Sequence, residues 1–103
     1  MFVVRIEMKV QPEQLGAFRE YAGADGLEAR KLPGCVDYTF CEEIGNPSRV
    51  LLYEEWSSRA QFEAYRASSV FLATGPRLRS MLAAPPKSAY YESDDVSAAR
   101  AVR

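Results

Sequence analysis

The chain has 103 residues, 48% hydrophobic and 26% charged, and its 13 Lys and Arg residues against 14 Asp and Glu residues give a net charge of -1. This composition predicts one globular domain with a thin core, and the scattered basic residues exclude a nucleic-acid site, which needs a basic patch. The sequence has no histidine, which excludes a histidine general base, a Ser-His-Asp triad and histidine ligands to zinc or haem.

The N-terminal segment reads as a strand followed by a helix. Hydrophobic and charged residues alternate over residues 2–10, which is the period of a half-buried strand. Pro12 then favours the first turn of a helix, which Pro33 and Gly34 bring to an end. The helix carries a stripe of residues at helical spacing, large at its start and small at its end: Leu15, Phe18, Ala22, Gly26 and Ala29.

Two strands follow, joined by a turn over residues 45–48, whose composition is Gly-Asn-Pro-Ser. The first runs from Cys35 to Ile44, with one face formed by Val36, Tyr38, Phe40 and Ile44. The second runs from Arg49 to Trp56 and is apolar on both faces, with Val50, Leu52 and Trp56 on one and Leu51 and Tyr53 on the other. A strand that is apolar on both faces is expected to be central and covered on both sides.

The remaining segments predict two helices and a last strand. Ser58 and Gln61 fit a capping box, so a helix begins there with Phe62, Tyr65 and Ser69 on its inward stripe. A short helix is expected over residues 76–82 and a strand over residues 87–93. Residues 94–103 are small and charged, and we expect a tail that is mobile or held by a partner subunit.

The order β-α-β-β-α-β predicts an α+β, ferredoxin-like fold with an antiparallel sheet over residues 1–93. Helices cover one face of such a sheet and leave the other face open. Leu51 and Tyr53 lie on the open face, where apolar side chains are a liability in a monomer. We therefore expect a homodimer.

The two cysteines, Cys35 and Cys41, are expected to be free thiols. They are six positions apart in one strand, roughly 20 Å at ~3.3 Å per residue, which is too far for a disulfide. The N-terminus lacks the features of a signal peptide, and no apolar run is long enough to span a membrane. These observations predict a cytoplasmic protein.

Three motifs point to one family when they are taken together. They are Leu32-Pro33-Gly34-Cys35 before the second strand, Tyr53-Glu54-Glu55-Trp56 at the end of the third, and Phe-Glu-Ala-Tyr-Arg-Ala-Ser-Ser-Val-Phe over residues 62–71. In this order and spacing the sequence resembles the antibiotic biosynthesis monooxygenase (ABM) domain family over residues 2–92.

The resemblance implies a dimeric α/β barrel that holds an aromatic or quinone-like ligand between the sheet and the helices. Several members of the family oxidise anthrones or hydroquinones with O2 without metal or flavin, so no cofactor is expected. The sequence departs from the family at Tyr65, where members commonly carry a histidine. Mechanisms that use this histidine therefore do not transfer to this chain.

Three residues are candidates for catalysis. Trp56 offers an indole N–H to a bound ketone or quinone, and Tyr65 offers a phenolic donor on the inward helix stripe. Glu54 lies on the same strand face as Trp56 and would act as a base if burial raises its pKa. The alternative for both aromatic residues is a packing role, and for Glu54 it is an ion pair with Arg5 or Arg66.

Four residues are candidates for binding the substrate. Arg66 would hold a substrate oxyanion unless it is a solvated charge on the helix flank. The other three would line the pocket or belong to the core: Tyr38, Phe40 and Phe71.

The leading hypothesis is a cofactor-independent monooxygenase acting on an anthrone- or quinol-like substrate. The alternatives are a ligand-binding dimer without catalysis and an isomerase of a small oxygenated signal. The leading hypothesis expects Trp56 and Tyr65 to converge on a dry hollow that is large enough for a ring-shaped ligand.

Overall fold

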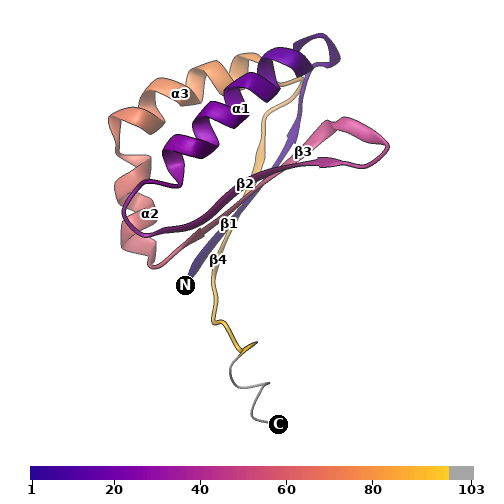
Figure 1. The fold of residues 1–103 in the computed structure, drawn as a ribbon. Coiled ribbons are helices and arrows are strands. Elements are labelled where there is room, and N and C mark those ends of the chain that lie inside the picture. The colour runs from indigo at the N-terminus through magenta and orange to yellow at the C-terminus, as the bar shows by residue number, and fades with distance from the viewer. Residues whose placement is uncertain (98–103) are drawn as a thin grey trace.

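The fold is a four-stranded antiparallel sheet covered on one face by helices, as the computed structural model describes it for residues 1–97 (Figure 1). The strands lie in the order β2-β3-β1-β4. Their bounds are Phe2–Lys9 for β1, Cys35–Glu43 for β2, Asn46–Trp56 for β3 and Lys87–Glu92 for β4. The α+β, ferredoxin-like prediction is confirmed, with β1 and β3 at the centre of the sheet.

The described helices all lie on the same side of the sheet (Figure 1). A 3-10 turn over Pro12–Gln14 leads into α1, Leu15–Ala29, and two further helices, α2 over Arg59–Arg66 and α3 over Ser69–Ser80, follow β3. Within residues 1–97, no helix combines the length and the apolar character that crossing a membrane requires.

The pairing register decides which side chains face the helices. Glu54 of β3 lies between Val4 of β1 and Tyr38 of β2, and Trp56 pairs with Phe2. Because side chains alternate along a strand, these residues share the helix-covered face. The core that they form with the helices includes Phe2, Val4, Met8, Phe18, Tyr21, Tyr38, Val50, Leu52, Trp56, Phe62 and Tyr65.

The helical segment after β3 is longer than the sequence predicted. The expected helix over residues 76–82 begins at Ser69 instead, because the Ser68 hydroxyl caps it by accepting from the Phe71 N–H at 3.2 Å. Pro76, which was expected to open the helix, lies inside it. The predicted cap of α2 is confirmed, since Ser58 Oγ accepts from the Gln61 backbone N–H.

The face predicted for the second strand is wrong at both ends. A bulge between Cys35 and Asp37 turns Val36 outward, leaving it 56% exposed, while Cys35 packs against the core. Ile44 is fully exposed because the hairpin turn is Ile44–Gly45, with Gly45 at φ +87°. The turn thus comes one residue earlier than the predicted 45–48 segment.

The remaining boundaries agree within a few residues. The first helix ends at Ala29, before the Pro33-Gly34 dipeptide, and β4 ends one residue before the predicted Ser93. Residues 98–103 of the predicted tail lie outside the described residues.

Candidate functional site

A buried acidic side chain lies at the centre of the sheet, beside the only tryptophan of the chain. Glu54 is 2% exposed and Trp56 is fully buried. Both project from β3 toward the helices, and the Trp56 indole N–H donates a hydrogen bond of 2.9 Å to Glu54 Oε1. Neither Arg5 nor Arg66 forms the ion pair with Glu54 that the sequence left open, and no other cation within residues 1–97 does so.

A second group of buried polar atoms connects three elements. Tyr38 of β2 donates a hydrogen bond of 2.9 Å to Asp25 Oδ2 of α1, and its hydroxyl lies 3.1 Å from the Tyr65 hydroxyl of α2. Because Tyr38 donates to Asp25, Tyr65 is the donor in the second bond. Tyr65 also stacks on Trp56, with ring centroids 5.0 Å apart, so the two groups form one cluster. We call these five residues, Asp25, Tyr38, Glu54, Trp56 and Tyr65, the polar cluster.

Asp25 was not singled out from the sequence, although a signal for it exists. It lies four residues after Tyr21 and four before Ala29, and all three side chains are buried on α1. An acidic residue in the middle of an apolar helical stripe indicates a buried carboxyl group with a partner. Both Asp25 and Tyr21 were missed because the predicted stripe passed through Ala22 and Gly26 instead.

The polar cluster has a distinctive protonation chemistry. Burial raises the pKa of Glu54 to about 7, against the opposing hydrogen bond from Trp56, and the nearby Asp25 carboxylate raises it further. Burial also raises the pKa of Asp25, and the hydrogen bond from Tyr38 limits that rise. The pKa values of the Tyr38 and Tyr65 hydroxyls are raised, mainly by burial, so both remain proton donors at neutral pH. Two carboxyl groups that can gain or lose a proton therefore lie beside two neutral hydroxyls.

The predicted hollow between Trp56 and Tyr65 is filled by their own rings. The two side chains converge as expected, but they stack face to face, and Phe71 packs edge-on against Tyr65 with centroids 5.3 Å apart. Phe40 lies farther along the core, edge-on to both Tyr38 and Phe18. These contacts place the aromatic candidates in the core and leave no ring-sized space between Trp56 and Tyr65.

An open hollow instead lies between α1 and α3, and it meets the polar cluster at Asp25. It has a volume of about 230 Å³, and its lining includes Tyr21, Asp25, Val70, Thr74 and Arg77. The Arg77 guanidinium lies over the Tyr21 ring, 5.6 Å from its centroid. Asp25 thus belongs both to the lining of the hollow and to the polar cluster.

The predicted anion-binding residue, Arg66, does not lie beside this hollow. Arg66 is exposed at the end of α2, where its guanidinium covers the Phe62 ring at 5.8 Å from the centroid. Arg77 is the arginine beside the hollow. The sequence placed Arg77 on a helix over residues 76–82, but it did not join that helix to Val70 and Thr74, which line the same hollow.

The described residues offer no evident metal centre. Among residues 1–97, no group of three or more Cys, Asp or Glu side chains lies close enough to hold a metal ion.

The roles of the predicted catalytic and binding residues stay predictions.

Comparison with known proteins identifies the family. The family model described as "Antibiotic biosynthesis monooxygenase" matches residues 1–77. No protein with curated annotation matches the chain.

Solved structures share the fold. A conserved protein from Methanosarcina mazei Go1 is 25% identical with a TM-score of 0.85, covering 90% of this chain and 92% of its own. Rv0793 from Mycobacterium tuberculosis is 21% identical with a TM-score of 0.83, covering 93% and 97%. A structure named antibiotic biosynthesis monooxygenase is 18% identical with a TM-score of 0.84, covering 92% and 100%. The matched family model, together with the three sequence motifs and this fold, shows that the chain belongs to the antibiotic biosynthesis monooxygenase family.

Proposed function

We propose that the protein is a cofactor-independent monooxygenase that oxidises an electron-rich aromatic substrate, of the anthrone or hydroquinone type, with O2. The observation that carries this proposal is the position of Asp25, a residue that lines the α1–α3 hollow and whose carboxyl group accepts a hydrogen bond from buried Tyr38. A substrate in the hollow would meet a base that is already connected to a chain of proton donors.

The reaction requires a general base, a substrate ring held in one orientation, and a group that stabilises the developing negative charge. The Asp25 carboxylate takes the acidic proton of the substrate, and the resulting anion passes an electron to O2. The substrate radical and superoxide combine into a peroxide anion, which recovers the proton from Asp25 and loses water to leave a ketone, so that R2CH2 and O2 give R2CO and H2O. The Arg77 guanidinium, at the rim of the hollow, stabilises the substrate oxyanion.

The size of the hollow limits the substrate. Pockets for drug-sized ligands measure about 300–1,000 Å³, so a hollow of about 230 Å³ holds one or two rings and leaves the rest in solvent. Tyr21 and Val70 supply the apolar walls against which a ring packs. We therefore expect small anthrones and hydroquinones with an exposed substituent to be better substrates than large fused systems.

Oxygen uptake by metal-free protein with a panel of anthrones and hydroquinones tests the proposal. Uptake should exceed the uncatalysed rate, and Asp25→Asn should lower kcat by about 10²-fold or more, as expected for loss of a general base. Glu55→Gln is the matched control, because Glu55 lies on the opposite face of β3. No uptake with any member of the panel would rule out the oxygenase.

A second candidate function is ligand binding without turnover. The stacking of Trp56 on Tyr65 favours the absence of turnover, because the two candidate catalytic rings contact each other and not a ligand. In that case hydroquinones would perturb Tyr21 and Val70 signals in NMR spectra, but oxygen would not be consumed. An isomerase of a small oxygenated signal predicts product formation without oxygen uptake, and loss of it in Glu54→Gln.

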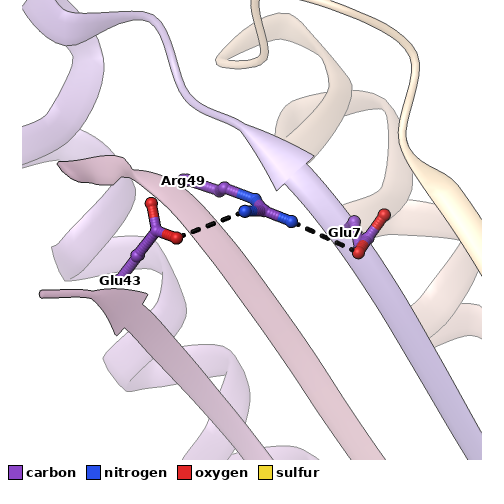
Figure 2. A network of polar contacts seen from close by, with 3 residues as sticks. All are labelled: Glu7, Glu43 and Arg49. Carbon is purple, nitrogen blue, oxygen red and sulfur yellow. Dashed lines mark hydrogen bonds and ion pairs between the residues drawn. The ribbon is translucent and has the colours of Figure 1, made fainter.

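We further propose that two chains pair through the open faces of their sheets. Leu51 and Tyr53 are half-buried on this face, and Arg49 forms ion pairs with Glu43 of β2 at 3.2 Å and with Glu7 of β1 at 3.5 Å (Figure 2). A face with apolar side chains and internally paired charges suits a second copy of itself. Light scattering at micromolar concentration would show a monomeric mass if this were wrong.

We also propose a cytoplasmic location, in keeping with the two free thiols, Cys35 and Cys41. Thiol titration of the protein, denatured directly in fresh cell lysate, should find both cysteines reduced, and an oxidised Cys35 or Cys41 would contradict this location.

A further inference from the structure

The polar cluster contains three oxidisable aromatic side chains in ring contact. Trp56 stacks on Tyr65 with centroids 5.0 Å apart and planes at 23°, and Tyr65 contacts Tyr38 with centroids 6.1 Å apart. All three are almost completely buried. The line begins at Trp56 and ends at Tyr38.

Each end of this line has a carboxyl group positioned to accept a proton. The Trp56 N–H donates to Glu54 and the Tyr38 hydroxyl donates to Asp25, both at 2.9 Å. Removing one electron from an indole or a phenol makes its N–H or O–H strongly acidic. A neutral radical therefore forms readily only where a base lies within hydrogen-bond distance, and both ends of the line meet this condition.

We propose that Trp56, Tyr65 and Tyr38 form a redox relay that carries an electron hole from Trp56 to Tyr38 and holds it there as a neutral tyrosyl radical. The oxidant is an organic peroxyl radical. It takes one electron from Trp56 and becomes the peroxide anion, while the indole proton passes to the Glu54 carboxylate. This activity goes beyond the proposed oxygenation and does not depend on it.

The second step restores Trp56. Tyr38 gives an electron through the Tyr65 ring to the Trp56 radical, which recovers its proton from Glu54. The Tyr38 phenolic proton passes to Asp25. The net result is a neutral Tyr38 radical, a protonated Asp25 and a Trp56–Glu54 pair in its original state. One oxidising equivalent has then moved from Trp56, at the end of β3, to Tyr38, whose hydroxyl is bound to Asp25 of α1.

Two other tyrosines, Tyr90 and Tyr53, are less well placed to receive the hole. Tyr90 is half exposed and is connected to Trp56 only through Phe62, with centroid distances of 5.7 and 6.1 Å. Phenylalanine is much harder to oxidise than tyrosine, so this route is interrupted. Tyr53 donates to a carboxylate as Tyr38 does, but it lies on the opposite face of the sheet.

The experiment uses the single tryptophan as the starting point. A laser pulse at a wavelength absorbed only by tryptophan ionises Trp56 in the intact protein, with an electron scavenger present. Transient absorption then follows the tryptophanyl band and the tyrosyl band. In the wild type the tyrosyl band should grow as the tryptophanyl band decays, and D2O should slow the conversion because protons move with the electron.

The variants identify the route and the end point. Tyr38→Phe should lose the tyrosyl band, and Tyr65→Phe should slow its growth. Asp25→Asn keeps the shape of the acceptor but cannot take the proton, so the yield of tyrosyl should fall. Tyr90→Phe and Tyr53→Phe are the controls and should behave as the wild type.

Two results would overturn the relay. One is a tryptophanyl radical that decays in the wild type without the appearance of a tyrosyl band. This measurement does not depend on the folding of any variant. The other is a tyrosyl band that survives in Tyr38→Phe but disappears in Tyr90→Phe, which would assign the hole to the surface route.

Discussion

The rings of Trp56 and Tyr65 lie 5.0 Å apart with their planes at 23°, although one comes from the end of β3 and the other from α2. Their contact closes the space in which the sequence placed a ligand. It leaves the Asp25 side of the polar cluster as the part that a molecule in the α1–α3 hollow can reach. A molecule in the hollow would thus contact the polar cluster only at Asp25 of α1.

The Tyr38 hydroxyl should contribute more to stability than the Tyr65 hydroxyl. Tyr38 bonds to both Asp25 and Tyr65, whereas Tyr65 bonds only to Tyr38 within the described residues. Tyr65→Phe should lower the free energy of unfolding by about 1 kcal/mol, and Tyr38→Phe by about 2–3 kcal/mol, because it strands a buried carboxyl group. Urea denaturation at neutral pH measures both losses, and equal losses would contradict this ranking.

Stability should fall as pH rises from about 4.5 to about 7. The pKa of Glu54 is raised to about 7 in the folded protein, from an ordinary value of 4.5. As the pH rises, Glu54 therefore loses its proton first in the unfolded chain, and this ionisation stabilises the unfolded state relative to the folded state. The slope is therefore negative in this window and vanishes above it, with a total loss of about 3 kcal/mol. The raised pKa of Asp25 acts in the same direction.

Glu54→Gln is the variant that tests this pH dependence. It removes the titration while it keeps the acceptor for the Trp56 N–H, so the fall in stability between pH 4.5 and 7 should become shallower. Glu55→Gln should leave the slope unchanged. A wild-type stability that rises through this window would show that Glu54 is ionised in the folded protein.

The fold could be predicted because hydrophobic spacing determines it. The alternation in β1 predicts a half-buried strand and the two apolar faces of β3 predict a central one, and the structure has both strands at the centre of the sheet. The errors lie where a local device overrides spacing. A bulge turns Val36 outward, and the Ser68 cap starts α3 ahead of Pro76.

The candidate site could be predicted only in part. The shared strand face of Glu54 and Trp56 follows from their separation by two residues, and their burial agrees with it. The partnership of Asp25 with Tyr38 depends on how α1 lies across β2, which spacing along one chain does not specify. The closed packing of Tyr65 on Trp56 likewise depends on side-chain rotamers.

Leu51→Asp should convert the proposed dimer into a monomer. The aspartate would place an unpaired charge at the centre of the open sheet face, next to Glu7 across the β1–β3 pair. Leu27→Asp is the control, because Leu27 is 61% exposed on α1. Light scattering should show half the wild-type mass for Leu51→Asp and the wild-type mass for Leu27→Asp. A Leu51→Asp variant that remains dimeric would contradict an interface on the open sheet face.

Gly34→Ala should destabilise the protein more than Gly45→Ala, although both glycines have positive φ angles, +80° and +87°. The strain of a left-handed alanine, about 1–2 kcal/mol, is common to both variants. At Gly45 the added Cβ meets nothing within 4 Å, whereas at Gly34 it overlaps the Gln61 side chain, including its Cβ at 2.8 Å.

The overlap at Gly34 would disturb the start of α2. The Gly34 carbonyl accepts from the Ser57 N–H at 2.8 Å, and Gln61 is the residue whose N–H the Ser58 hydroxyl caps. Displacing Gln61 therefore loosens the cap, which alone stabilises by about 1 kcal/mol. Urea denaturation should give Gly34→Ala a clearly lower free energy of unfolding than Gly45→Ala. Adding Gln61→Ala to Gly34→Ala should recover part of this difference in the free energy of unfolding. Equal losses for the two glycine variants would show that α2 yields to the added methyl group without cost.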